Sequence, residues 1–514
     1  MSTIVSQFFN TVERAPEHTA LVFADIEISY SKLADAVRRL AAALQQRHIE
    51  KGDRVAIMLP NVPHFVISYY AILSVGAIAV PVNFMHTPAE IEHQLKDSGA
   101  RLLITWQGFY HQIWEIYSNT ETCSDILMLG EHIPSQFDSL TQTIASTDPL
   151  PQTIESEENE IAVLNYTSGI SDWALGAALT HSAIAYNTAT CVDMFRISPQ
   201  ERLIAVLPLF HPLGQTLVMH ASLSTGATLV MLPRFNAQEA IKTIRQYNVS
   251  IMPAVPGMFR AFNEVDDDTM DMPSLKFCMS YGGHLPQDTL EAFETRYNTT
   301  ILKAYGLTEA GPLVSSTRLD HDRKIDSVGL PLMGVEVQIR DATGQILRPN
   351  HTGEIFIKSP GVMQGYWGQS QETEQRLQND WLATGDIGYL DFDHYLYIQE
   401  RKDDIILKGG FEIHSREVER ILLEHPTVDE VAVVAVSDAV QGSEVKAFVV
   451  LKPQLSSEPQ ELVTYCQNAL PLYKCPKYVE FVDALPKTPT GRILKRLLRQ
   501  GITTLQTGEN TNKR

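Results

Sequence analysis

Hydrophobic residues in the first 150 positions follow two alternating spacings. Residues 31–44 and 65–76 carry apolar side chains at helical intervals, whereas residues 55–59, 80–82 and 102–104 are short apolar runs. The first spacing is typical of helices packed on a core, and the second is typical of buried strands. Strands and helices that alternate in this way predict a doubly wound α/β sheet.

The alternation continues beyond residue 200. Strands are predicted at residues 203–209, 227–232, 251–255 and 276–280, with helices between them. These central strands lack strict polar alternation, which is typical of a parallel sheet covered on both faces. Between about residues 325 and 400 the pattern changes to short strands and turns rich in Gly, Asp and Asn, which predicts a small β-rich subdomain.

The last hundred residues carry a second α/β pattern. Helices are predicted near residues 417–423 and 459–470, and strands near 431–436 and 445–451. A chain of 514 residues is too long for one compact core. We therefore expect a large N-terminal domain, residues 1–402, and a smaller C-terminal domain, residues 403–500. The polar tail, residues 501–514, is expected to be disordered.

Composition excludes several classes of protein. With 41 Lys and Arg against 61 Asp and Glu, the formal charge is −20, which argues against a general nucleic-acid binder. The five cysteines are scattered and include no CxxC pair, so we expect a reducing compartment with neither disulfides nor a zinc cluster. Glu13 and Arg14 precede any long apolar run, and no stretch approaches the ~18 apolar residues of a membrane span. A cytoplasmic protein is expected.

A turn of small residues follows the predicted strand at residues 161–164 and precedes another apolar segment. Such a turn can direct several backbone N–H groups at an anion such as phosphate, although Ser and Gly also mark ordinary surface loops. The stretch from Tyr166 to His181 resembles the phosphate loop of the adenylate-forming superfamily, which includes acyl-CoA synthetases, firefly luciferases and the adenylation domains of peptide synthetases. The loop of that family reads roughly T-S-G-T-T-G-x-P-K-G. The matching residues are Thr167, Ser168, Gly169 and Gly176, and the departures are Ile170, Asp172, Ala174 and Leu175.

The segment Tyr305-Gly-Leu-Thr-Glu309 is the strongest intact motif, although alone it also suits a strand-end turn. The resemblance implies that Tyr305 lies against adenine, that Thr308 reaches the α-phosphate and that Glu309 binds Mg²⁺. Gly282 and Gly283 match the turn on the adenine side of the family site, and a plain left-handed turn is the equal alternative.

The resemblance also assigns residues to the acyl group and the ribose. His211 matches the residue at the entrance of the acyl pocket, and a capping or core histidine explains it equally well. Asp386, in Thr384-Gly-Asp386, matches the carboxylate that accepts the ribose hydroxyls, with Arg401 beside it.

Three further features of the C-terminal region match the family. Asp403 stands at its hinge, and Gly409 and Gly410 stand where a pantetheine arm approaches the backbone. Arg492 replaces the lysine that bridges the acid and the α-phosphate, keeping the charge in a bulkier shape. A solvated basic helix face is expected for Lys495, Arg496 and Arg499.

The implied function is an ATP-dependent acid–thiol ligase. It activates a small carboxylic acid as acyl-AMP and passes the acyl group to coenzyme A or to the phosphopantetheine of an acyl carrier protein, with Mg²⁺ as cofactor. The departures at Leu175 and Arg492, together with Asp172, leave an alternative open: a derivative that does not adenylate. Such a derivative is either a nucleotide- or acyl-binding partner protein or an enzyme that keeps only acyl transfer. The apolar segments within 211–258 and 281–315 favour an uncharged aliphatic or aromatic acyl group.

Overall fold

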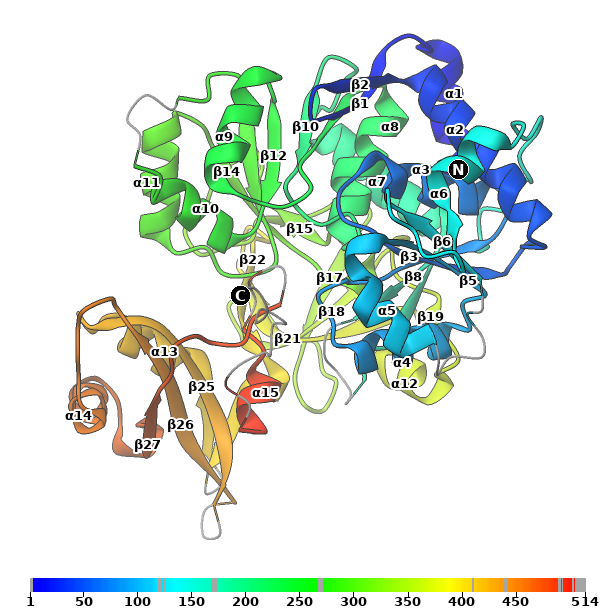
Figure 1. Cartoon of the computed structure of the whole chain (residues 1–514). Coiled ribbons are helices and arrows are strands. Elements are labelled where there is room, and N and C mark those ends of the chain that lie inside the picture. Colours follow the sequence, from blue (N-terminus) through cyan, green and yellow to red (C-terminus); the bar gives the residue numbers. More distant parts are fainter. Residues whose placement is uncertain are drawn as a thin grey trace, which may run out of the picture. The chain divides into compact units, whose positions relative to one another are not determined.

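The computed structural model describes residues 3–117, 123, 125–167, 173–266, 271–408, 411–438, 442–488, 491, 493–501 and 503 (Figure 1). Internal contacts divide the chain into two compact units. The first unit comprises Met1–Val337 and Ile357–Ala383, and the second comprises Gln338–Phe356 and Thr384–Arg514. Each unit is described by itself below.

The first unit contains a nine-stranded sheet across its described residues, in the order β16-β15-β14-β13-β12-β10-β11-β1-β2. The six strands from β14 to β1 run parallel, and β2, β15 and β16 are antiparallel additions at the edges. Their bounds are β1 Thr19–Phe23, β2 Ile26–Ser29, β10 Arg202–Ala205, β11 Thr228–Met231, β12 Ile251–Ala254, β13 Phe277–Ser280, β14 Ile301–Tyr305, β15 Ser315–Ser316 and β16 Leu330–Pro331.

A second sheet of this unit has eight strands in the described ranges, in the order β19-β9-β8-β4-β3-β5-β6-β7. Strands β8 to β7 are parallel, whereas β9 and β19 are antiparallel additions. The bounds are β3 Arg54–Met58, β4 Ile78–Pro81, β5 Leu102–Trp106, β6 Asp125–Leu129, β7 Asp138–Ser139, β8 Ile161–Tyr166, β9 Gly176–Thr180 and β19 Gly365–Tyr366. Parallel strands flanked by helices confirm the predicted doubly wound α/β class.

Helices cover these sheets in the way that their apolar patterns predict. Helices α4 and α5 bury Ile91, Leu95, Ile113 and Ile116 in one core with strands of the eight-stranded sheet. Helix α3 carries apolar residues on all sides, and all of its residues except His64 are buried. Figure 1 shows α9, α10 and α11 beside strands β12 and β14. The helices of this unit are α1 Ile4–Arg14, α2 Tyr30–Gln46, α3 Pro63–Ser74, α4 Pro88–Ser98, α5 Tyr110–Tyr117, α6 Leu140–Ser146, α7 His181–Met194, α8 Ala221–Thr225, α9 Ala237–Gln246, α10 Pro256–Asn263, α11 Gln287–Tyr297 and α12 Ser370–Arg376.

The predicted strand at residues 203–209 is shorter than expected, because β10 ends at Ala205. The Asn61 side chain takes the place of a neighbouring strand beyond that point. Its amide donates to the carbonyls of Ala205 and Leu207 at 3.0 and 2.9 Å, and its oxygen accepts from the Leu209 N–H at 2.8 Å. Pro208 has no N–H to continue the ladder. The chain then enters a π-helix, η2, Gly214–His220.

The β-rich region predicted at about 325–400 forms a five-stranded sheet in its described residues, in the order β17-β18-β21-β20 with β22 paired to β21. The strands are β17 Glu336–Arg340, β18 Gly353–Lys358, β20 Leu377–Gln378, β21 Trp381–Leu390 and β22 Leu396–Arg401. The chain passes from one unit to the other at three points, which lie within β17, β18 and β21.

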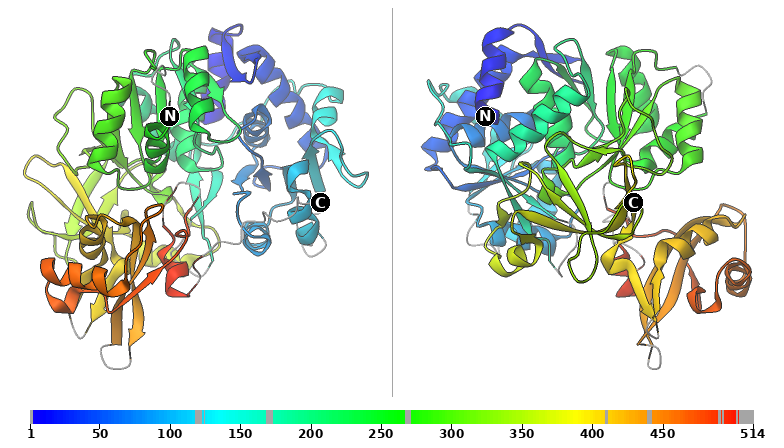
Figure 2. Two further views of the ribbon diagram at one scale, coloured as in Figure 1. Left: turned by 60° about the vertical axis from the view of Figure 1, so that its left-hand side comes forward. Right: turned by 180° about the vertical axis from the view of Figure 1, so that it is seen from behind.

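The remainder of the second unit packs helices on a small sheet. A long antiparallel pair, β25 Val428–Asp438 and β26 Gly442–Leu451, continues in parallel to β27 Tyr478–Phe481, and β23 Ile405–Lys408 forms a hairpin with β24 Phe411–His414. Helices α13 Ser415–Leu423 and α14 Pro459–Ala469 bury Val418, Ile421 and Leu462 against these strands, and the short helix α15 Lys495–Arg499 buries Leu498. Figure 2 shows this orange part of the chain from two further sides.

Candidate active site

The phosphate-loop motif begins and ends on paired strands. Tyr166, the last residue of β8, is paired with Gly176, the first residue of β9, and the Thr167 N–H donates to the Leu175 carbonyl at 2.9 Å. The Thr167 hydroxyl is buried and has no hydrogen-bond partner in the described part of the chain. A buried hydroxyl without a partner is costly, so this atom is suited to a ligand oxygen. Ser168 and Gly169, with Ile170 and Asp172, lie outside the described residues.

Leu175 stands where the family motif has its loop lysine. Its side chain is only 7% exposed. The chain therefore places an apolar side chain in the interior at this position, where the family motif has a cation.

The motif at Tyr305–Glu309 is held in a tight turn at the end of β14. A Cβ on Gly306 would lie 1.9 Å from the Pro312 carbonyl oxygen, so only glycine allows the two backbone segments to approach this closely. Thr308 and Glu309 follow in a single 3₁₀ turn, η3, Thr308–Ala310.

Glu309 is a buried carboxylate with a defined orientation. It is 5% exposed, and its Oε1 accepts a hydrogen bond from the Tyr366 hydroxyl at 2.9 Å. Tyr366 lies in β19 and is paired with Ala177 of β9. Glu309 is therefore fixed against the strand that follows the phosphate loop. Tyr366 could not be predicted from the sequence, since a tyrosine on a two-residue strand carries no local signal of its partner.

His211 contacts Tyr281, the residue that precedes Gly282. The His211 and Tyr281 rings lie edge to face, with centroids 6.2 Å apart, and the Tyr281 hydroxyl donates to the Pro312 carbonyl at 3.4 Å. Gly282 has φ +86°, the left-handed conformation that glycine favours, and Gly283 follows it. The nearby Ser280 hydroxyl, at the end of β13, is buried and has no partner among the residues that the structure describes. The described residues predicted for phosphate, adenine and acyl contacts thus all belong to the first unit.

The second unit brings together the residues predicted for the ribose. Asp386 on β21 is paired with Arg401 on β22, and an Arg401 Nη1 lies 3.2 Å from Asp386 Oδ1. The same nitrogen donates to the Thr384 carbonyl at 3.1 Å, while the Thr384 hydroxyl accepts from the Asp386 N–H at 3.1 Å. The Asp386 carboxylate is therefore oriented by a cation and by the backbone on which it sits.

The sequence predicts that helix α15 exposes a basic face to solvent, and the structure contradicts this prediction. Lys495 is 13% exposed, and its Nζ lies 2.7 Å from Glu419 Oε1 and 2.8 Å from the Ser415 hydroxyl. Arg499 Nη2 donates to the Asp403 carbonyl at 2.7 Å and to the Asp404 carboxylate. The predicted solvent exposure is wrong, because the carboxylates of Glu419 and Asp404, remote in sequence, contact Lys495 and Arg499. Arg496 is half-buried as well. Gly409, Gly410 and Arg492 lie outside the described residues.

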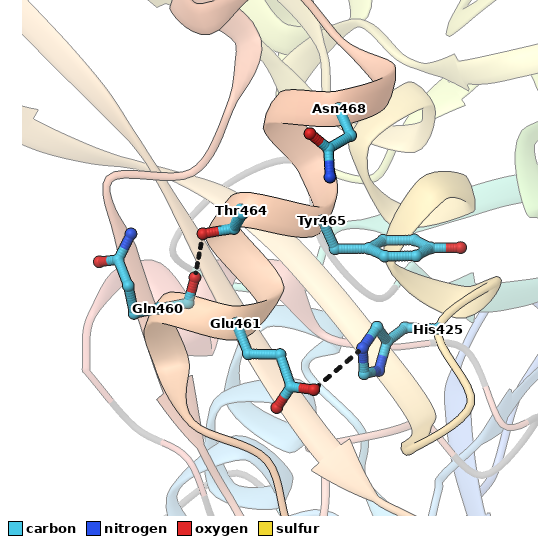
Figure 3. A pocket seen from close by; sticks show the side chains of 6 residues that line it. All are labelled: His425, Gln460, Glu461, Thr464, Tyr465 and Asn468. Carbon is cyan, nitrogen blue, oxygen red and sulfur yellow. Dashed lines mark hydrogen bonds and ion pairs between the residues drawn. The ribbon is translucent and has the colours of Figure 1, made fainter.

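A hollow on the surface of the second unit lies apart from these motifs in sequence (Figure 3). His425 Nε2 lies 3.8 Å from Glu461 Oε1, and the His425 ring meets Tyr465 edge to face at 4.9 Å. Its lining residues are His425, Gln460, Glu461, Thr464, Tyr465 and Asn468. No residue singled out by the sequence motifs is among them.

Neither a metal cluster nor a membrane-spanning helix is present among the described residues. They contain no group of three or more His, Cys, Asp or Glu side chains placed to hold a metal ion. They also contain no helix that is both long and apolar enough to cross a membrane.

Two α/β sheets and a buried Glu309 beside a phosphate-loop frame agree with the resemblance to the adenylate-forming superfamily. The family model described as "AMP-binding enzyme" matches residues 8–367, and that of the "AMP-binding enzyme C-terminal domain" matches residues 417–492. The chain belongs to the AMP-binding enzyme family, and within it to the acyl-CoA synthetase-like ligases.

Relatives and solved structures agree with this assignment over nearly the whole chain. The long-chain-fatty-acid–CoA ligase of Bacillus subtilis (strain 168) is 34% identical, covering 96% of this chain and 94% of the relative. ATP-bound MatB from Rhodopseudomonas palustris has a TM-score of 0.90 at 27% identity, covering 98% of this chain and 99% of that structure. The fatty acyl CoA synthetase of Mycobacterium tuberculosis has a TM-score of 0.79 at 29% identity, with 98% of both chains covered.

Proposed function

We propose that this protein is an ATP-dependent ligase of long-chain fatty acids and coenzyme A. The acid carboxylate attacks the α-phosphate of ATP, giving acyl-AMP and pyrophosphate, and the thiol of coenzyme A then attacks the acyl carbon, giving the thioester and AMP. Relatives named for this activity, at 30% identity or more over at least 93% of the chain, support the choice of acid and of thiol. Coenzyme A is thereby favoured over a carrier-protein arm.

The observation that carries the proposal is the junction of η3, β19 and β9. It places the Glu309 carboxylate, held by Tyr366, beside the strand that follows the phosphate loop. The unpartnered hydroxyl of Thr167 lies at the other end of the same loop. An anionic phosphate chain that passes between them would find a donor at Thr167 and, near Glu309, a place for its counter-cation.

Glu309 fits Mg²⁺ that arrives with ATP. Mg²⁺ in nucleotide sites is held by one or two carboxylates together with phosphate oxygens and water, so a dedicated cluster of protein ligands is not required. Bound there, the ion would supply positive charge to the phosphate oxygens. Thr308, next in the same turn, is assigned to the α-phosphate.

Further residues are proposed for the nucleoside. Tyr305, Gly282 and Gly283 are proposed for adenine, and Asp386 with Arg401 for the ribose. The Arg401 guanidinium, 3.2 Å from Asp386 Oδ1, orients the carboxylate, whose oxygens are suited to accept from two ribose hydroxyls. His211, with its ring against Tyr281, is proposed for the entrance of the acyl pocket.

The C-terminal residues complete the proposal. Residues 403–500 are proposed to move about Asp403, bringing Arg492 to the phosphate for adenylation and Gly409 with Gly410 to the pantetheine arm for transfer. Leu175 is buried and apolar, and Arg492 is proposed as the cation that replaces the family lysine. Loss of one such donor typically costs on the order of 10²–10³ in rate, so slower adenylation is expected than in members with both lysines.

Pyrophosphate release from Mg-ATP tests the function directly. Wild-type protein and the Glu309→Gln variant are assayed with short, medium and long straight-chain acids and with an aromatic acid, with and without coenzyme A. We expect turnover with long-chain acids and formation of the acyl thioester. Were no acid to release pyrophosphate while a supplied acyl-adenylate still became a thioester, the protein would be the derivative that keeps only acyl transfer.

A further inference from the structure

His211 lies in a turn, residues 208–214, that leads from the segment after β10 into the π-helix η2. The His211 N–H donates to the Pro208 carbonyl at 3.1 Å, and the Gln215 N–H donates to the His211 carbonyl at 3.1 Å. His211 is partly exposed, whereas every other residue in the range 209–220 is buried. A buried stretch of chain therefore presents this one histidine at the edge of the interior.

The Gln215 side chain holds this turn from the inside. It is 2% exposed, and its Nε2 donates to the Phe210 carbonyl and to Asn165 Oδ1, each at 3.2 Å. Its Oε1 accepts from Asn165 Nδ2 at 3.3 Å and from the Tyr69 hydroxyl at 3.5 Å. Both donors and both acceptor positions of the amide are thus in use. The orientation of the amide is defined as well, since the Phe210 carbonyl only accepts.

The partners of Gln215 are themselves fixed in the fold. Asn165 lies on β8, is 2% exposed and is paired with Ala177 of β9. Tyr69 lies on the buried helix α3. Buried polar groups are costly without partners, so two side-chain amides that satisfy each other specify one arrangement of the chain. The amide pair therefore ties the turn of His211 to β8 of the eight-stranded sheet.

Two further residues restrain the same turn. Asn61 Oδ1 accepts from the Leu209 N–H at 2.8 Å. A Cβ on Gly214 would lie 2.4 Å from the Pro208 carbonyl oxygen, so glycine allows the start of η2 to approach the beginning of the turn. These contacts fix the backbone on both sides of His211.

The orientation of the His211 ring is set within its own turn. Nδ1 accepts from the Leu213 N–H at 3.3 Å, so the neutral imidazole carries its proton on Nε2. The ring also meets Tyr281 edge to face. A histidine with a defined tautomer on a fixed backbone is suited to orient a carboxyl group.

We propose that Gln215 is a positioning residue for the acid. Paired with Asn165, it holds the backbone at Phe210 so that His211 meets the carboxyl end of the acid at the entrance of the acyl pocket. This inference rests on the proposed function and adds a residue that the sequence motifs do not single out. Gln215 acts through His211 and does not itself touch the acid, because the protein occupies all of its hydrogen-bonding positions. Without the amide, the Phe210 carbonyl would lose this donor and the turn would relax.

The test compares two buried glutamines of the first unit. Gln215→Met keeps the length of the side chain and removes its hydrogen bonds. Gln94→Met is the matched control, because Gln94 is also 2% exposed and its amide donates to a backbone carbonyl, that of Pro81, at 2.9 Å. His211→Ala and the double variant, His211→Ala with Gln215→Met, complete the set. For each variant, the KM for hexadecanoic acid, the KM for ATP, kcat, the dissociation constant of hexadecanoic acid and the thermal unfolding temperature are measured.

We expect Gln215→Met to raise the KM and the dissociation constant of the acid about 2- to 10-fold, the range for the loss of one hydrogen bond, with an unchanged KM for ATP. Gln94→Met should leave the values for the acid unchanged. Both methionine variants lose buried hydrogen bonds and should unfold at a lower temperature than the wild type. In the His211→Ala background, Gln215→Met should change the values for the acid little further, because Gln215 acts through His211.

The inference is wrong if Gln215→Met binds and converts the acid as the wild type does. It is also wrong if Gln94→Met raises the KM for the acid as much, since lost stability then explains the effect, or if the effects of His211→Ala and Gln215→Met multiply. Gln215→Asn is one methylene shorter and loses at least one of the contacts to Asn165 and Phe210. It takes the place of Gln215→Met, with the same expected direction, if that variant does not fold.

Failure of the proposed function is a separate outcome, in which no acid releases pyrophosphate with the wild type. The dissociation constants of hexadecanoic acid still decide the role of Gln215 in that event. Weaker binding by Gln215→Met than by the wild type supports the role, whereas equal binding, or no binding by either protein, refutes it.

Discussion

Replacing Lys495 with methionine would remove the cation that neutralises Glu419 inside the second unit. The two side chains are 13% and 14% exposed, and Nζ lies 2.7 Å from Oε1. Burial raises the pKa of the Glu419 carboxyl, and the Lys495 ammonium opposes that rise. The carboxylate keeps one other donor, the Val433 N–H at 2.8 Å.

The size of the effect follows from the burial of the pair. Removing one partner of a buried ion pair costs about 3–5 kcal/mol, since the other charge stays buried without compensation. Because the Val433 N–H remains, we expect the lower end, about 3 kcal/mol, in the free energy of opening α13 and β25.

The effect depends on pH with a definite sign. A carboxyl whose pKa is raised on folding binds its proton more tightly in the folded state. Its contribution to stability is therefore complete below its ordinary value of 4.5 and is lost as the pH rises through its folded pKa. Without Lys495 the folded pKa rises further, so the variant should be destabilised more at neutral than at mildly acid pH.

Hydrogen exchange of the intact protein, followed by mass spectrometry, measures this locally. Peptides from α13 and β25 should lose protection in Lys495→Met and regain part of it in Lys495→Met with Glu419→Gln, which removes the stranded charge. Arg420→Met is the control, because Arg420 and Glu424, 3.5 Å apart, are 69% and 54% exposed and should contribute less than about 1 kcal/mol. Equal protection in Lys495→Met and Arg420→Met would refute the argument from burial.

Three further predictions concern the first unit. Glu309→Gln should lower the rate of pyrophosphate release about 10²–10³-fold without lowering the unfolding temperature. An unchanged rate would show that Glu309 takes no part in the reaction. Gly306→Ala should weaken ATP binding and lower the unfolding temperature, because the new Cβ would lie 1.9 Å from the Pro312 carbonyl oxygen; Gly257→Ala, with no atom within 4 Å of its Cβ, is the matched control and should fold normally. Burial lowers the pKa of His220 to about 3, so this imidazole must take up a proton on unfolding below its ordinary value of 6.5. Stability should therefore fall as the pH drops from 6.5, and His220→Asn should show a shallower fall in acid titration followed by circular dichroism.

Local sequence alone determined most of the helices and strands and several site motifs. The apolar pattern of residues 31–44 predicts α2, observed at Tyr30–Gln46, because spacing along a helix is decided within a few turns. The turn at Gly306 is also local, since a missing Cβ is a property of one residue. Where a distant side chain intervened, the prediction was wrong: Asn61 binds the backbone beyond Ala205 and ends β10 early.

Tertiary structure decided the surroundings of the charged and aromatic side chains. Lys495 is in a basic run that is typical of a solvated helix face, yet Glu419, remote in sequence, lies beside it and the pair is largely buried. Tyr366 at Glu309 and His93 at Trp173 are likewise brought together by the folding of separate strands and helices. Spacing in the sequence reports which face of an element a residue occupies, but burial and hydrogen bonding depend on which other element covers that face. For these residues the covering element lies far along the chain, so only the folded structure identifies their partners.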